Sequence, residues 1–400
     1  MDTRERTILA SAGVVGIFVL VQLGALALVE PFHQEGHQVA EDTGDPSLSL
    51  FFILAILVVT AVMLAALKRG GQNVMRLLII FAGAYIAFFV FDVLAPDLLV
   101  VSIGEMPIDV IAVLAALGLG GLLYAYPEWY VIDGAGIVMG IGAAGLFGVN
   151  LEIFPVLVLL VGLAIYDAIS VYGTEHMLTL ASGVMKMRVP VVLVVPLTLS
   201  YTFLDEDLPD PVRDDESEES EGEPVETTGE SGREESEGTN EDGKGTNEDG
   251  EDPLTAAYLE ELGPEGIAEL EPHRLQEIDP EEFQELDDEL REVVSEQLPS
   301  RDALFIGLGD AVIPTVLVAS AAFFVDAPAI ELGIMSPNVP ALTAMGGTML
   351  GLVALLWLVS KGRAHAGLPL LNGGAIAGYL LGALASGLTL VEALGLSAFF

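Results

Sequence analysis

Long apolar runs without charged residues restrict the fold of this chain more than any other feature. A helix of roughly 17–25 apolar residues is long enough to cross the hydrocarbon core of a membrane. We therefore predict an all-α polytopic membrane protein with nine transmembrane helices, at residues 8–29, 48–67, 74–95, 107–126, 130–149, 153–172, 302–325, 339–360 and 368–390. The first run is too long for the apolar part of a cleaved signal peptide, so we interpret it as an uncleaved span.

The distribution of basic residues predicts the orientation in the membrane. With nine spans, all 15 Lys and Arg fall in the N-terminal segment and in the second, sixth and eighth connecting loops. Because basic residues are enriched in cytoplasmic loops, we predict a cytoplasmic N-terminus and an extracellular C-terminus in the cell membrane.

The negative charge is concentrated in one loop. The formal net charge is −43, and most of the acidic residues lie between Asp205 and Glu296. Acidic loops and scarce lysine are typical of proteins in high salt, where self-repulsion is screened. We predict a halophilic archaeal source; the alternative is an acidic loop on an ordinary prokaryotic protein. The absence of cysteine excludes disulfides and thiol catalysis.

Four regions are predicted from these patterns. Residues 1–204 hold spans one to six and a short cytoplasmic apolar segment, and residues 299–400 hold spans seven to nine. Residues 205–253 are acidic and of low complexity, which predicts disorder. Residues 254–298 have apolar residues at helical spacing, which predicts a small acidic helical insert.

Two acidic residues lie deep inside predicted spans. Asp92, Asp109 and Asp133 are within a few residues of span ends, and we interpret them as interfacial residues solvated by water and headgroups. Asp167 is about 21 Å from the outer face and Asp310 about 14 Å from the inner face, at about 1.5 Å of helix rise per residue. In a core about 30 Å thick, both carboxylates reach a similar level.

Two carboxylates at one depth indicate a specific chemistry. They cannot comfortably ionise together, so one retains its proton while the other is an anion. The anion can take a proton from water while the acid protonates a scissile carbonyl, which is the mechanism of amide hydrolysis. The alternatives are an inert hydrogen bond between the two acids, or a proton- or cation-coupled transporter, since acids inside membranes also form ion pathways.

These residues carry a family resemblance. The motifs are "YD" at Tyr166-Asp167 and "GLGD" at Gly307-Leu308-Gly309-Asp310, the latter followed by "AVIP". In this order, on either side of a cytoplasmic loop, they resemble the YD and GxGD motifs of the presenilin and signal peptide peptidase family, and its archaeal members most. The resemblance implies an intramembrane aspartyl endopeptidase with Asp167 and Asp310 as its catalytic pair. A catalytically silent relative that binds transmembrane helices is a further alternative. Gly307 and Gly309 are expected to permit close helix approach and local backbone deformation.

The family's third motif, Pro-Ala-Leu at the start of the last span, has two candidates. A literal copy lies at Pro340-Ala341-Leu342, but it begins the eighth span at the predicted outer face. We assign the role to Ala366-Gly367-Leu368, followed by Pro369, because this segment begins the ninth span from the inner side. A residue before proline favours an extended conformation, so Leu368 could present backbone groups to a substrate.

One more segment suggests how a substrate would be held. Residues 188–201, "RVPVVLVVPLTLSY", are rich in β-branched residues, bounded by prolines and short for a span. They resemble a segment that precedes the second catalytic span in signal peptide peptidases. A helical substrate must be unwound before hydrolysis, and an exposed strand could receive it by β-augmentation. The alternative is an interfacial or re-entrant apolar segment.

We expect no cofactor and no metal. His33 and His37 are one helical turn apart, but no third ligand is evident near them. The expected partners are transmembrane proteins or peptides as substrates and the lipid bilayer, and no nucleic acid. Neither the substrate nor any accessory subunit or oligomeric state follows from the sequence.

Overall fold

The computed structural model describes most of the membrane part of the chain. The described residues are 3–38, 44, 46–68, 72–95, 99–103, 106–172, 190–197, 255–268, 270, isolated positions between 275 and 294, and 303–333, 335–359 and 366–397. The chain divides into two compact units, Met1–Arg213 with Ala303–Phe400, and Asp214–Asp302. The predicted disordered loop, 205–253, lies outside the described residues, and the predicted region boundaries stay predictions.

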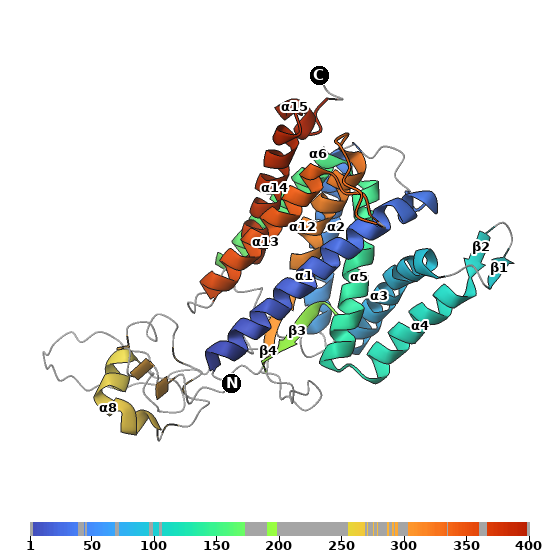
Figure 1. The fold of residues 1–400 in the computed structure, drawn as a ribbon. Coiled ribbons are helices and arrows are strands. Elements are labelled where there is room, and N and C mark those ends of the chain that lie inside the picture. Colours follow the sequence, from blue (N-terminus) through green and yellow to red (C-terminus); the bar gives the residue numbers. More distant parts are fainter. Residues whose placement is uncertain are drawn as a thin grey trace, which may run out of the picture. The chain divides into compact units, whose positions relative to one another are not determined.

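The first unit is built mainly from helices (Figure 1). Before the long loop they are α1 (Thr3–Gln34), α2 (Pro46–Lys68), α3 (Gln72–Leu94), α4 (Val110–Ala125), α5 (Trp129–Asn150) and α6 (Ile153–Tyr172). After it come α12 (Leu308–Phe324), α13 (Val339–Val359), α14 (Gly367–Ala385) and the short α15 (Leu390–Ala393). The mostly helical fold that we predicted is confirmed.

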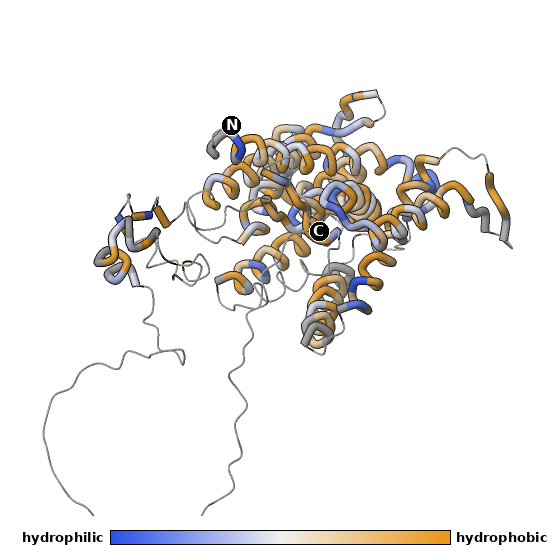
Figure 2. Tube along the Cα trace, turned by 90° about the horizontal axis from the view of Figure 1, so that it is seen from below, coloured by the Kyte–Doolittle hydropathy of each residue, from blue (hydrophilic) through white to orange (hydrophobic). Residues whose placement is uncertain are grey.

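Most of these helices have the length and composition of membrane spans. Six candidate spans are found among the described residues, in α1, α3, α5, α6, α13 and α14. Hydrophobic residues predominate along the helical part of the chain (Figure 2). Helices α4 and α12 are shorter apolar helices of 16 and 17 residues, whereas α2 has 23 residues. The chain is thus a multi-pass membrane protein, and the count of nine spans stays a prediction.

Two short antiparallel strand pairs interrupt the helical fold. Strands β1 (Val100–Ile103) and β2 (Met106–Asp109) form a hairpin before α4, and β3 (Val192–Pro196) pairs with β4 (Ala303–Gly307). The predicted helices 107–126 and 302–325 were therefore wrong at their first residues. A short apolar run is compatible with a strand or a helix, and β-branched and aromatic residues favour the strand. In β3, the valines at 192, 194 and 195 show this preference.

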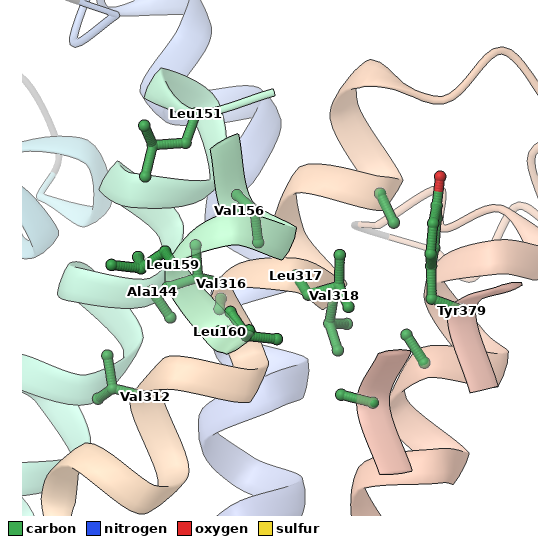
Figure 3. Packing of buried hydrophobic residues seen from close by; sticks show 14 of the residues in the cluster. Ala144, Leu151, Val156, Leu159, Leu160, Val312, Val316, Leu317, Val318 and Tyr379 are labelled. Atoms are coloured by element: carbon green, nitrogen blue, oxygen red, sulfur yellow. The ribbon is translucent and has the colours of Figure 1, made fainter. Parts of the chain in front are cut away.

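The core of the first unit forms around α5, α6 and α12. Figure 3 shows side chains of these helices interdigitating, with Ala144 from α5, Leu160 from α6 and Val316 from α12 close together. The Ser320 hydroxyl donates to the Leu151 carbonyl over 2.8 Å, which ties α12 to the α5–α6 connection. Because α12 packs against several helices, its first turn is held in place by the core.

Glycines bring α13 and α14 into backbone contact. A Cβ atom at Gly347 would overlap the carbonyl of Gly374, and one at Gly378 would overlap the carbonyl of Thr343. Small residues at such a crossing let two helix backbones approach closely. The backbones of α13 and α14 are therefore closely packed along their crossing.

The second unit has a hydrophobic cluster of its own. Helix α8 (Ala256–Ala268) is kinked at Gly263, whose φ is 65°, followed by Pro264. The cluster consists of Leu259, Ile267, Leu275, Ile278, Leu286, Leu290 and Val294. The apolar residues that we noted at helical spacing thus form a small core.

Candidate active site

Asp167 lies in the last part of α6 and is 5% exposed. Its Oδ2 accepts a hydrogen bond of 3.0 Å from the backbone N–H of Leu368, at the start of α14. The backbone amide of Gly367 is also directed at this carboxylate. The first turn of α14 therefore orients the Asp167 side chain.

Asp310 is in the first turn of α12, directly after strand β4. We predicted the depth of Asp310 from helix rise over the residues before it, and this was wrong, because residues 303–307 are extended. An ideal Cβ on Gly367 would lie 3.2 Å from Asp310 Oδ2 and 3.4 Å from its Cγ. The Asp310 carboxylate also interacts electrostatically with Asp167. The two carboxylates, called the aspartate pair below, therefore both lie against Gly367 in the first turn of α14.

The segment 366–368 lies beside the aspartate pair, whereas Pro340-Ala341-Leu342 does not. Pro340 is the second residue of α13, and its Cα would be 3.0 Å from a Cβ on Gly382. Gly382 is near the far end of α14, about 22 Å from Gly367 at about 1.5 Å per residue. A hydrogen bond of 2.9 Å from Asn372 Nδ2 to the Leu160 carbonyl holds the near end of α14 against α6.

The remaining motif residues are less tightly packed than Gly367. Tyr166 and Pro369 are partly buried. A Cβ on Gly307 would be in ordinary contact with Asp310 Oδ2, at 3.5 Å, and one on Gly309 would have nothing within 4 Å. The close helix approach that we expected is not seen at these two glycines, and the close contact at this site is between Gly367 and the Asp310 side chain. Gly307 ends a strand and Gly309 lies exposed in the first helical turn.

Strand β3 is connected to α5 by a residue that we did not predict to be functional. Asp133 is 7% exposed, and its Oδ1 accepts a hydrogen bond of 2.7 Å from the Val194 N–H. Asp109 is also buried, and it caps α4 by accepting from Ile111 N–H over 2.6 Å. Our interpretation of Asp109 and Asp133 as solvated interfacial residues was therefore wrong. The sequence contains one signal that could have revealed Asp133. Gly136 and Gly140 follow it at helical spacing, so the three residues share one helix face.

His33 and His37 lie at the C-terminal end of α1 and just beyond it, and they make separate contacts. His37 Nε2 is 3.6 Å from Asp92 Oδ2, and its ring packs edge-on against Phe32 and Phe89. The His33 ring lies against Phe323.

Fold and site together define a class of protein, a helical multi-pass membrane protein with two carboxylates converging on one helix start. Residues 15–226 and 279–388 match the family described as "Signal-peptide peptidase, presenilin aspartyl protease". The match covers well over half of the chain, so the chain belongs to the signal-peptide peptidase and presenilin family of aspartyl proteases. The predicted family and the predicted enzyme class, an intramembrane aspartic protease, are confirmed.

Solved structures agree with this assignment. The chain is similar to a presenilin family intramembrane aspartate protease in two crystal forms. In the first, the TM-score is 0.51 at 27% identity, covering 94% of this chain and 99% of that one. In the second, it is 0.50 at 28% identity, covering 93% and 97%. No curated protein matches the chain. The archaeal, halophilic source stays a prediction.

Proposed function

We propose that the chain is an endopeptidase that hydrolyses peptide bonds within transmembrane segments or signal-peptide remnants, with the aspartate pair as general acid and base. One carboxylate takes a proton from a water molecule while the other protonates the scissile carbonyl. The pair shares a single proton at rest, since two neighbouring carboxylates cannot both ionise comfortably. Each turnover returns the proton, so no cofactor is needed.

The observation that carries this proposal is the arrangement of both aspartates around the start of α14. Leu368 N–H donates to Asp167, and Gly367 lies against Asp310 without a side chain between them. The bond to Leu368 fixes the orientation of the Asp167 carboxylate at the start of α14. Such preorganisation lets the two carboxylates act on one peptide group without reorganisation at the moment of reaction.

The strand pair β3–β4 supports a role in holding the substrate. Leu308 N–H donates to the Val191 carbonyl over 2.8 Å, so hydrogen-bonded pairs in this antiparallel ladder include Leu193 with Ile306. The N–H of Val194 therefore faces away from β4, and Asp133 occupies it. The outer edge of β4 pairs with no other strand among the described residues. We propose that an unwound substrate segment adds to this edge, which leads directly into Asp310.

The same proposal includes the orientation in the membrane. A cytoplasmic N-terminus puts all basic residues on the inner side, and the aspartate pair then acts in the inner half of the bilayer. Family membership speaks against a proton- or cation-coupled transporter. A catalytically silent relative would keep the same geometry, and only an activity measurement separates it from an active protease.

The first test compares wild type with Asp167→Asn and Asp310→Asn, each purified as the full chain in detergent at high salt. A single-span test peptide is the substrate, and product masses are read by mass spectrometry. We expect cleavage within the apolar segment by wild type and a loss of about 10²–10⁴-fold in each variant, the usual contribution of a general acid or base.

Asp109→Asn is the matched control, because Asp109 is an equally buried carboxylate that caps α4 away from the aspartate pair. It is expected to cut like wild type. If the Asp167 and Asp310 variants also cut like wild type, the assignment of the pair is wrong. If wild type binds the peptide without cutting it, the silent alternative holds.

A further inference from the structure

Asp133 is a buried carboxylate that the proposed reaction does not use. It lies in the first turns of α5, within a predicted span. Burying a carboxylate within a membrane protein is costly and is unfavourable without a partner or a role. Its one described hydrogen bond goes to the backbone N–H of Val194, which is itself 1% exposed.

This hydrogen bond falls on a specific edge of the strand pair. As shown above, the Val194 N–H points away from β4. Strand β3 is therefore an edge strand on that side, and an edge strand carries unpaired N–H and C=O groups. Asp133 accepts a hydrogen bond from one of these N–H groups, that of Val194. It thereby attaches β3 to α5 at the edge where another strand could otherwise pair with β3.

The face of α5 that carries Asp133 also contacts the chain next to Asp310. Asp133, Gly136 and Gly140 are spaced i, i+3 and i+7, so they lie on one helix face. A Cβ on Gly136 would be 2.9 Å from Leu193 Cδ2, and one on Gly140 would be 3.3 Å from Leu308 Cδ1. The glycines thus make room for side chains of β3 and of the first turn of α12. This turn contains Asp310.

From this arrangement we propose that Asp133 is a positioning residue, which holds strand β3, and through it β4 and the first turn of α12, at the correct place on α5. Its effect on catalysis rests on the proposed function, whereas its effect on the strand pair does not. The group that matters is the accepting Oδ1 atom, so a side-chain amide at this position should replace the carboxylate.

The test uses the full chain in detergent at high salt, in the variants Asp133→Asn and Asp133→Ala. Asp109→Ala is the matched control, because it removes an equally buried carboxylate that accepts backbone N–H groups elsewhere. Hydrogen–deuterium exchange is read by mass spectrometry on peptides covering residues 190–197 and 303–307. The kcat, the KM and the cleavage positions are measured with the single-span peptide.

We expect Asp133→Ala to speed exchange in both strand peptides, to lower kcat by about tenfold or more, and to spread or shift the cleavage positions. Asp133→Asn should restore all three readouts, and Asp109→Ala should leave them unchanged. Val194→Pro is a second variant that removes the donor instead of the acceptor. Proline is tolerated where a strand's N–H faces away from the ladder. It should reproduce the Asp133→Ala result.

Two results would overturn the proposal. One is unchanged strand exchange in Asp133→Ala and Val194→Pro, and the other is an Asp133→Asn variant as impaired as Asp133→Ala. A purely structural role would lower thermal stability in Asp133→Ala and Asp109→Ala alike, without a selective change in strand exchange or cleavage position. If wild type cuts no peptide, the exchange measurement alone decides the role of Asp133, and the proposed function fails separately.

Discussion

Glycine occurs along the α13–α14 pair and again beside Asp310, but its surroundings in the two regions differ. In the helix pair, Gly347 and Gly378 face backbone atoms of the neighbouring helix so closely that no Cβ fits. Beside Asp310, Gly309 has no atom within 4 Å of the position its Cβ would take. Gly367 is intermediate, with the Asp310 carboxylate 3.2 Å away.

The difference separates two uses of one residue type. In the α13–α14 pair, glycine permits close packing and determines the distance between two helices. At Gly309 it leaves space unoccupied next to Asp310, and under the proposed function a substrate backbone would enter this space. Gly367 combines both, because it belongs to α14 and contacts the aspartate pair. Alanine substitutions should therefore affect stability in one region and activity in the other.

The largest effect on stability is expected from Gly378→Ala. The added methyl group would overlap the Thr343 carbonyl, and backbone atoms cannot move as a side chain can. We expect a loss of about 1–3 kcal/mol or more, the usual cost of overpacking, seen as a lower midpoint in thermal unfolding. Gly373→Ala is the control in the same helix, since its Cβ meets nothing within 4 Å. Equal midpoints in the two variants would contradict the close packing.

A smaller and different effect is expected from Gly367→Ala. Its methyl group would lie 3.2 Å from Asp310 Oδ2, so the carboxylate must shift by a few tenths of an ångström. We expect kcat to fall by about tenfold, because small displacements of reacting groups are costly, with little change in unfolding. The peptide-cleavage assay measures this, again against Gly373→Ala. A variant with lower stability and unchanged kcat would place Gly367 with the packing glycines.

The smallest effect is expected from Gly309→Ala. With open space around its Cβ, the change should alter stability by no more than about 0.5 kcal/mol. If the substrate enters this space, KM rises while kcat changes less. Gly346→Ala, which also has open space around it, serves as the control in α13. Identical kinetics for wild type and Gly309→Ala would mean that the substrate backbone does not pass over Gly309.

The sequence alone was sufficient for the class of protein, and it predicted Asp167 and Asp310 as the catalytic pair. Apolar runs reveal spans because every buried backbone group in a membrane must be paired within its own element. Asp167 and Asp310 stand out because acids deep in such runs are rare. We chose residues 366–368 over Pro340-Ala341-Leu342 because the predicted topology begins the ninth span at the inner side and the eighth at the outer side. The contacts of residues 367 and 368 with Asp310 and Asp167 agree with this choice.

Only the tertiary structure revealed the strand at 303–307, the contact of Gly367 with Asp310, and the bond from Val194 to Asp133. Each depends on which segments meet, and these pairs are separated by 57, 61 or more residues, so no local pattern encodes them. The run from 303 to 324 carries no charged residue apart from Asp310, and it becomes a strand only where β3 supplies a hydrogen-bonding partner. Composition therefore determined what lies in the membrane, and long-range backbone hydrogen bonding decided how the aspartate pair is held there.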